Sequence, residues 1–86
     1  MPEISRFFGI VIKMFYEDHN PPHFHAEYGN EKVLIEIRTL SVFAGGLSPQ
    51  AMGLVIEWAT LHQQELLADW EKARVYEELK EIDPLK

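Results

Sequence analysis

The pair Gly29-Asn30 lies between two stretches of alternating residues and constrains the fold more than any other feature of the chain. Residues 23–28 and 32–38 each alternate apolar with polar side chains, a pattern typical of a strand with one buried face. Glycine and asparagine tolerate the positive φ angles that a two-residue hairpin turn requires. The sequence therefore predicts an antiparallel β-hairpin that turns at Gly29-Asn30.

A turn at these two residues also fixes the register of the hairpin, because successive side chains of a strand point to opposite faces of a sheet. The predicted cross-strand pairs are Glu27 with Lys32, His25 with Leu34, His23 with Glu36, Ala26 with Val33, and Phe24 with Ile35. One face of the hairpin is then apolar. The other face, called the polar patch below, is expected to carry His23, His25, Glu27, Glu36 and Arg38.

The segments on either side of the hairpin favour further strands. Residues 7–17 are rich in β-branched and aromatic side chains and are expected to form a strand covered on both faces for part of its length. Gly9 would mark a bulge or a close backbone approach within it. Pro21 and Pro22 predict a stiff loop before the hairpin, and residues 40–47 could add a short strand after it.

The C-terminal half of the chain favours helix. Ser48 is a typical N-cap, and Pro49 suits the first helical position. Apolar side chains three or four apart mark one face of residues 49–73, with a bend or break expected near Gln63. Pro84 prevents a helix near the end of the chain.

Together these patterns predict one α+β domain spanning residues 1–86. A three- or four-stranded antiparallel meander is expected in residues 4–45. One long helix or two shorter helices should follow in residues 48–75 and pack against a face of the sheet. Residues 76–86 are expected to form an extended or disordered tail.

Composition restricts the classes of function that the chain could perform. The 86 residues carry a formal net charge of −6, whereas nonspecific attraction to nucleic-acid phosphates requires clustered Lys and Arg. A nucleic-acid partner is therefore not expected. The chain contains no cysteine, which excludes thiolate ligands and fits a reducing compartment. No apolar stretch is long enough to span a bilayer, so we expect a cytoplasmic protein, for which a homodimer is compatible but not required.

Three of the four histidines lie within residues 19–25, in the spacing H-x3-H-x-H. On a strand, His23 and His25 point the same way about 6 to 7 Å apart, so both rings could reach one ion. His19 lies one loop away, and Glu36 lies across from His23, where it could supply an oxygen ligand or fix an imidazole tautomer. We therefore hypothesise a site for Zn²⁺ or another divalent transition metal, with His19, His23, His25 and Glu36 as ligands.

The same histidines allow two other interpretations. In a catalytic one, His19, His23 and His25 are candidate acids and bases, while Arg38 or Lys32 stabilises developing negative charge. In a structural one, the histidines hold the proline loop by hydrogen bonds or line a polar pocket without metal. His62 lies on the apolar stripe of the helical region and is expected to be structural, and Trp58 and Trp70 are expected to be core or interface residues.

Motifs along most of the chain resemble those of a known family. They include the Asp18-His19 step, Pro21-Pro22-His23-Phe24-His25-Ala26, Glu57-Trp58-Ala59, and the closing Ile82-Asp83-Pro84-Leu85. The chain resembles an uncharacterised bacterial family, the domain of unknown function with the label 4160. This resemblance implies a small cytoplasmic bacterial protein without an established activity, often encoded beside a second small protein, as in toxin-antitoxin pairs. It implies no mechanism.

Two functions from different classes are consistent with the sequence. The first is an interaction module, one member of a two-gene pair similar to toxin-antitoxin pairs, whose partner is a second small protein encoded nearby and whose polar patch suits a metal. The alternative is a small hydrolase or nuclease that uses His19, His23 and His25 with Glu36. Its chemistry would depend either on a metal or on direct acid-base catalysis.

Overall fold

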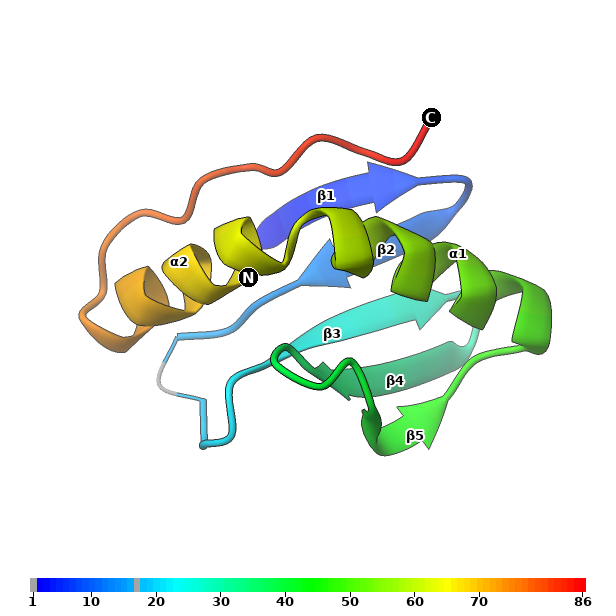
Figure 1. The fold of residues 1–86 in the computed structure, drawn as a ribbon, viewed down its shortest axis with the longest axis horizontal. Coiled ribbons are helices and arrows are strands. Elements are labelled where there is room, and N and C mark those ends of the chain that lie inside the picture. Colours follow the sequence, from blue (N-terminus) through cyan, green and yellow to red (C-terminus); the bar gives the residue numbers. More distant parts are fainter. Residues whose placement is uncertain (1, 17) are drawn as a thin grey trace.

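The computed structural model describes residues 2–16 and 18–86. Five strands form one antiparallel sheet in sequence order, and two helices follow them (Figure 1). The predicted α+β class and meander are therefore confirmed, although the sheet has five strands rather than the three or four expected. The strands are β1 (Glu3–Phe7), β2 (Ile10–Lys13), β3 (His23–Tyr28), β4 (Glu31–Glu36) and β5 (Val42–Gly46), and the helices are α1 (Pro49–Leu61) and α2 (Gln63–Arg74).

The additional strand arises from a tight turn that the sequence analysis did not predict. The expected single strand over residues 7–17 is wrong, because the chain reverses at Phe8 and Gly9 and pairs β1 with β2. Both turn residues have positive φ angles, 51° and 81°, as a two-residue hairpin turn requires. Gly9 therefore serves the turn, and the Phe8 side chain is left largely exposed.

The hairpin of β3 and β4 has the predicted register. All five predicted cross-strand pairs are present, and Gly29 in the turn has a φ angle of 60°. Its apolar face, formed by Phe24, Ala26, Val33 and Ile35, is fully buried. Alternation along the two strands thus separates this apolar face from His25, Glu27 and Glu36, but His23 at the start of β3 is buried, so the expected polar patch is wrong at this residue.

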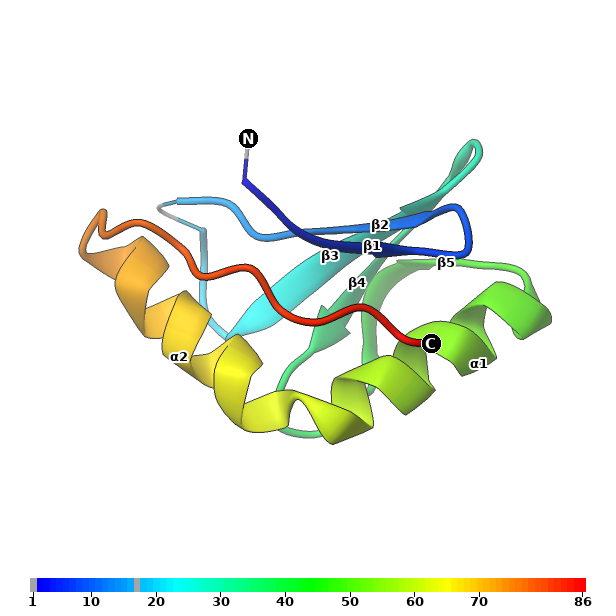
Figure 2. The ribbon, with the colours of Figure 1, turned by 90° about the horizontal axis from the view of Figure 1, so that it is seen from above.

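The two helices cover this apolar face of the sheet (Figure 2). Helix α1 begins at Pro49 with Ser48 as its N-cap residue, and α2 begins at Gln63, so both the predicted start and the predicted break are confirmed. Trp58 and Trp70 are buried in the core between helices and sheet, as expected. Neither α1 nor α2, the helices of the part of the chain that the structure describes, has the length and apolar character of a membrane-spanning segment.

The C-terminal segment, residues 77–86, forms neither helix nor strand but packs along β1 and the helices (Figure 1). The backbone N–H of Ile82 donates to the carbonyl of Ile4 at 2.8 Å, and Trp58 Nε1–H donates to the carbonyl of Asp83 at 2.8 Å. Ile82 itself is buried. The segment therefore partly covers the outer edge of β1.

Two glycines are expected to respond oppositely to substitution by alanine. Gly45 has a φ angle of 74°, and a Cβ atom there would lie 2.3 Å from the carbonyl oxygen of Lys32. Gly45→Ala should therefore lower the free energy of unfolding by about 2 kcal/mol or more. Gly53 lies within α1 with open space around it, so Gly53→Ala should raise that free energy by about 0.5–1 kcal/mol. Urea unfolding gives the free energy of unfolding of both variants. A change of the same sign and size in both would contradict the prediction.

A buried carboxyl on α2 is expected to make stability depend on pH. Asp69 accepts the backbone N–H of Lys80 at Oδ1, while Oδ2 has no hydrogen-bond partner among the described residues. Burial raises the pKa of the Asp69 carboxyl, and the nearby charge of Glu65 raises it further. The hydrogen bond from the Lys80 N–H and the positive charges of Lys72 and Lys80 lower this pKa, but burial outweighs them. A raised folded-state pKa means that stability is lost as pH rises from the unfolded-state value through the folded-state value.

Asp69→Asn should therefore stabilise the protein at pH 7 and have little effect at about pH 3, where the carboxyl is protonated in both states. Urea unfolding at the two pH values tests this. Glu71→Gln is the matched control, because Glu71 is an exposed acid on the same helix. An equal gain for Asp69→Asn at both pH values would show that ionisation is not the cause.

Candidate metal centre

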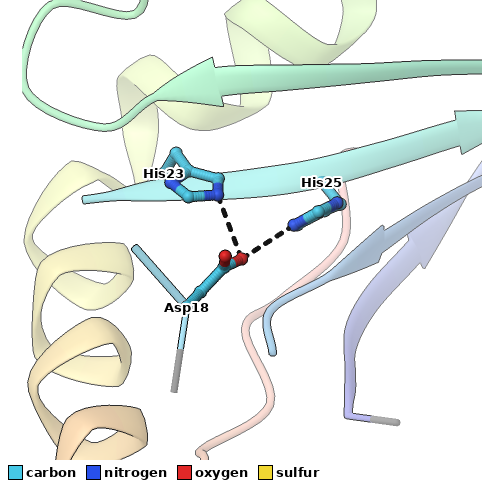
Figure 3. A group of neighbouring side chains, drawn as sticks. All are labelled: Asp18, His23 and His25. Atoms are coloured by element: carbon cyan, nitrogen blue, oxygen red, sulfur yellow. Dashed lines mark hydrogen bonds and ion pairs between the residues drawn. The ribbon is translucent and has the colours of Figure 1, made fainter. Parts of the chain in front are cut away.

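Three side chains meet beside the start of β3: Asp18 from the preceding loop, and His23 and His25 from the strand (Figure 3). Asp18 Oδ2 lies 3.0 Å from Nε2 of His23 and 3.0 Å from Nε2 of His25. One potential ligand atom from each residue lies within 4.8 Å of the other two. These three residues are called the Asp-His-His site below.

Local sequence explains how the chain brings these groups together. His23 and His25 are two residues apart on a strand, so their side chains project from the same face. The loop before them is held by the carbonyl of Pro22, which accepts the backbone N–H of Ile37 at 2.9 Å. Asp18 is oriented by the backbone N–H of His19, which donates to Oδ1 at 3.0 Å. Oδ2 is left to face the imidazoles.

The hydrogen bond of His23 fixes its tautomer. Nδ1 lies 2.8 Å from the carbonyl oxygen of Pro21, which can only accept, so Nδ1 carries the proton. In the neutral ring, Nε2 then presents a lone pair to the carboxylate of Asp18. The two atoms are 3.0 Å apart but lack the alignment of a hydrogen bond, and Nε2 is buried without a hydrogen-bond partner among the described residues. A cation between these two electron-rich atoms would stabilise the arrangement.

His25 is the more accessible imidazole. Its Nε2–H donates to Asp18 Oδ2 at 3.0 Å. The side chain of His25 is 22% exposed and that of Asp18 is 20% exposed, whereas that of His23 is 2% exposed. The site therefore has a buried side at His23 and a solvent-accessible side at Asp18 and His25.

Aromatic rings from distant parts of the chain surround the two imidazoles. The ring of His23 lies 5.2 Å from that of Phe43 in β5 and 5.3 Å from that of Trp70 in α2, measured between centroids. Phe15 contacts His25 edge-on, with centroids 4.4 Å apart. These rings restrict the rotation of both imidazoles, which favours a preformed site.

Electrostatics keep Asp18 ionised. Burial acts to raise its pKa, but the hydrogen bonds from His25 and from the His19 backbone oppose burial, and the pKa of Asp18 lies below its usual value. Asp18 is thus available as an anionic oxygen donor beside two imidazole nitrogens.

The structure places the other predicted ligands outside this site. Glu36 pairs with His23 in the register, and His19 lies in the adjoining loop with its side chain exposed. Neither belongs to the group of close ligand atoms found among the described residues. Asp18 takes the carboxylate position that the sequence analysis gave to Glu36. The only sequence signal for it was its place next to His19 at the start of the proline loop.

The remaining polar candidates have separate surroundings. Glu27 pairs with Lys13 at 3.2 Å, and Arg38 is exposed. His62 lies at the junction of α1 and α2, where its Nδ1–H donates to Glu65 at 2.6 Å and its ring contacts Trp58. His62 is thus engaged by the helices and does not belong to the Asp-His-His site.

The chain was compared with curated proteins, with solved structures and with protein-family models, and only the last comparison gives a match. Neither the curated proteins nor the solved structures include a significant match to the chain. A family model does match residues 9–71, a range that includes the whole Asp-His-His site and extends into α2. Because this range covers well over half of the chain, the protein belongs to the family described as domain of unknown function (DUF4160).

Proposed function

We propose that the protein binds one divalent transition-metal ion, with Zn²⁺ as the first candidate, through Asp18, His23 and His25. The observation that carries this proposal is the buried Nε2 of His23, which faces the Asp18 carboxylate at 3.0 Å without forming a hydrogen bond. A metal ion accepts electron pairs from both atoms at once and so removes the conflict between them.

The donor set and its spacing suit such an ion. Imidazole nitrogen and carboxylate oxygen bind Zn²⁺ at about 2.0–2.1 Å, which puts tetrahedral ligand atoms roughly 3.3 Å apart. The two 3.0 Å separations at Asp18 Oδ2 are close to this value, and the three ligand atoms lie within 4.8 Å of one another, so binding requires the two imidazoles to move closer together. The carbonyl of Pro21 already holds Nδ1 of His23, as outer hydrogen bonds do for metal-binding histidines.

Metal content and affinity test the proposal directly. Untagged protein is dialysed against chelator, titrated with Zn²⁺ by calorimetry, and analysed for bound metal after gel filtration. One ion per chain is expected. If the site instead holds only a shared proton, stoichiometric metal will be absent at every concentration, and the proposal fails.

Matched variants locate the ion. Asp18→Asn and His25→Ala should each weaken affinity by at least about 100-fold, because even residues outside the ligand set alter affinity about 10- to 100-fold. His19→Ala and Glu36→Gln should leave it unchanged, since neither side chain joins the site. His23 is left intact because its buried ring packs against Trp70. Equal losses in the control variants would assign the metal elsewhere.

The two roles expected from the sequence can be tested with the same preparations. The family resemblance supports a small bacterial cytoplasmic protein with a partner encoded nearby, and a three-ligand metal site supports hydrolysis. Co-expression with the neighbouring gene product tests the first role, and turnover of RNA or a model phosphodiester by zinc-loaded protein tests the second. His25→Ala should retain the partner and lose any turnover. Loss of the partner alone would contradict both assignments.

A further inference from the structure

We infer that the ion in the Asp-His-His site keeps one coordination position open on the side of Asp18 and His25, and that this position takes a small monoanion from solution. This inference rests on the proposed metal binding. The inference concerns the additional ligand that the bound metal ion takes from solution.

The number of protein donors supports an open position. Among the described residues only Asp18, His23 and His25 bring ligand atoms together. Zinc sites with a purely structural role usually have four protein ligands, whereas sites that bind a substrate or water have three. Glu36, the nearest alternative by strand register, lies outside the group.

Exposure indicates where the open position lies. His23 closes the inner side of the site with its ring against Trp70. The side chains of Asp18 and His25 both reach solvent, with about one fifth of their surfaces exposed. A ligand from solution therefore approaches the ion past these two side chains.

Charge and space define the class of ligand. A divalent ion with one carboxylate and two neutral imidazoles keeps a net charge of about +1, which favours a monoanion. Lys13, which is opposite His25 in the sheet, is already paired with Glu27 and adds little net charge. The rings of Phe15 and Phe43 pack on the two imidazoles, so a small anion fits better than a bulky one.

Cobalt-substituted full-length protein and sodium azide provide the test. Co²⁺ replaces Zn²⁺ in the site, and the visible spectrum of Co²⁺ depends on the number and kind of its ligands. Adding azide at constant ionic strength should change that spectrum saturably, with one azide per cobalt, while matched sodium perchlorate should not. Zn²⁺ added in excess should abolish the signal.

The outcomes separate this inference from the proposal that supports it. If neither Zn²⁺ nor Co²⁺ binds, both are overturned. If Co²⁺ binds one per chain but azide leaves its spectrum unchanged, the site is closed, and only the inference fails. The variants Glu36→Gln and Glu17→Gln test whether the protein supplies a fourth ligand. Glu17 is included because it precedes Asp18 in the sequence and lies outside the described residues. An azide response that appears only in one of these variants would show that the natural chain fills the position itself.

Discussion

Zn²⁺ at about 100 times its dissociation constant is expected to raise the melting temperature of the protein by roughly 10–20 °C. Binding at that concentration stabilises the folded state by about 2.7 kcal/mol, and each kcal/mol shifts the melting temperature of a domain this size by roughly 4–8 °C. The folded chain holds Asp18 Oδ2 3.0 Å from both imidazole nitrogens, whereas the unfolded chain has no such preformed site. Thermal unfolding followed by circular dichroism, with Zn²⁺ and then with chelator, measures the shift.

Specificity separates this stabilisation from general ionic effects. Asp18→Asn should lose nearly all of the shift, and His19→Ala should retain it. Mg²⁺ should produce no comparable shift, because it prefers oxygen ligands in an octahedral arrangement. A shift of equal size in Asp18→Asn would mean that Zn²⁺ stabilises the fold from another place.

Trp58→Ala is expected to lower the free energy of unfolding by about 3–5 kcal/mol, as is typical when a large buried ring is removed. Trp58 is fully buried against Phe7 and Phe24, with centroid distances of 5.4 Å and 5.9 Å. Its indole N–H also holds the carbonyl of Asp83, so the substitution releases the C-terminal segment as well as leaving a cavity. Urea unfolding monitored by circular dichroism gives the value.

Leu61→Ala on the same helix is the matched control, because Leu61 is 67% exposed. Its effect should stay within about 0.5 kcal/mol. Trp58→Phe should fall between the two, since it keeps most of the ring volume and removes the N–H donor. If Trp58→Ala were no more harmful than Leu61→Ala, the core described above would be wrong.

Local sequence rules predicted the parts of the fold that local geometry determines. The Gly29-Asn30 turn and the alternation on each side of it fixed the register of β3 and β4. The Ser48-Pro49 step fixed the start of α1. The turn at Phe8 and Gly9 escaped prediction because phenylalanine rarely adopts a positive φ angle, and the pairing of β1 with β2 overrides that preference.

The Asp-His-His site was only partly predictable for a related reason. The H-x-H spacing predicted that His23 and His25 lie on one side of a strand, and in the structure Nε2 of each ring lies 3.0 Å from Asp18 Oδ2. The position of Asp18 in the site depends on the path of an irregular loop. That loop is held by contacts with distant residues, such as the hydrogen bond from the backbone N–H of Ile37 to the carbonyl of Pro22. The burial of His23 likewise depends on Phe43 and Trp70, which lie far along the chain.

The contact between Ile82 and Ile4 has a consequence for how the protein is made. The first strand leaves the ribosome more than seventy residues before the segment that covers its outer edge. Until that segment arrives, the nascent chain presents an uncovered strand that a neighbouring nascent chain could pair with. Synthesis of residues 77–86 therefore ends a period of vulnerability to aggregation that begins when β1 emerges.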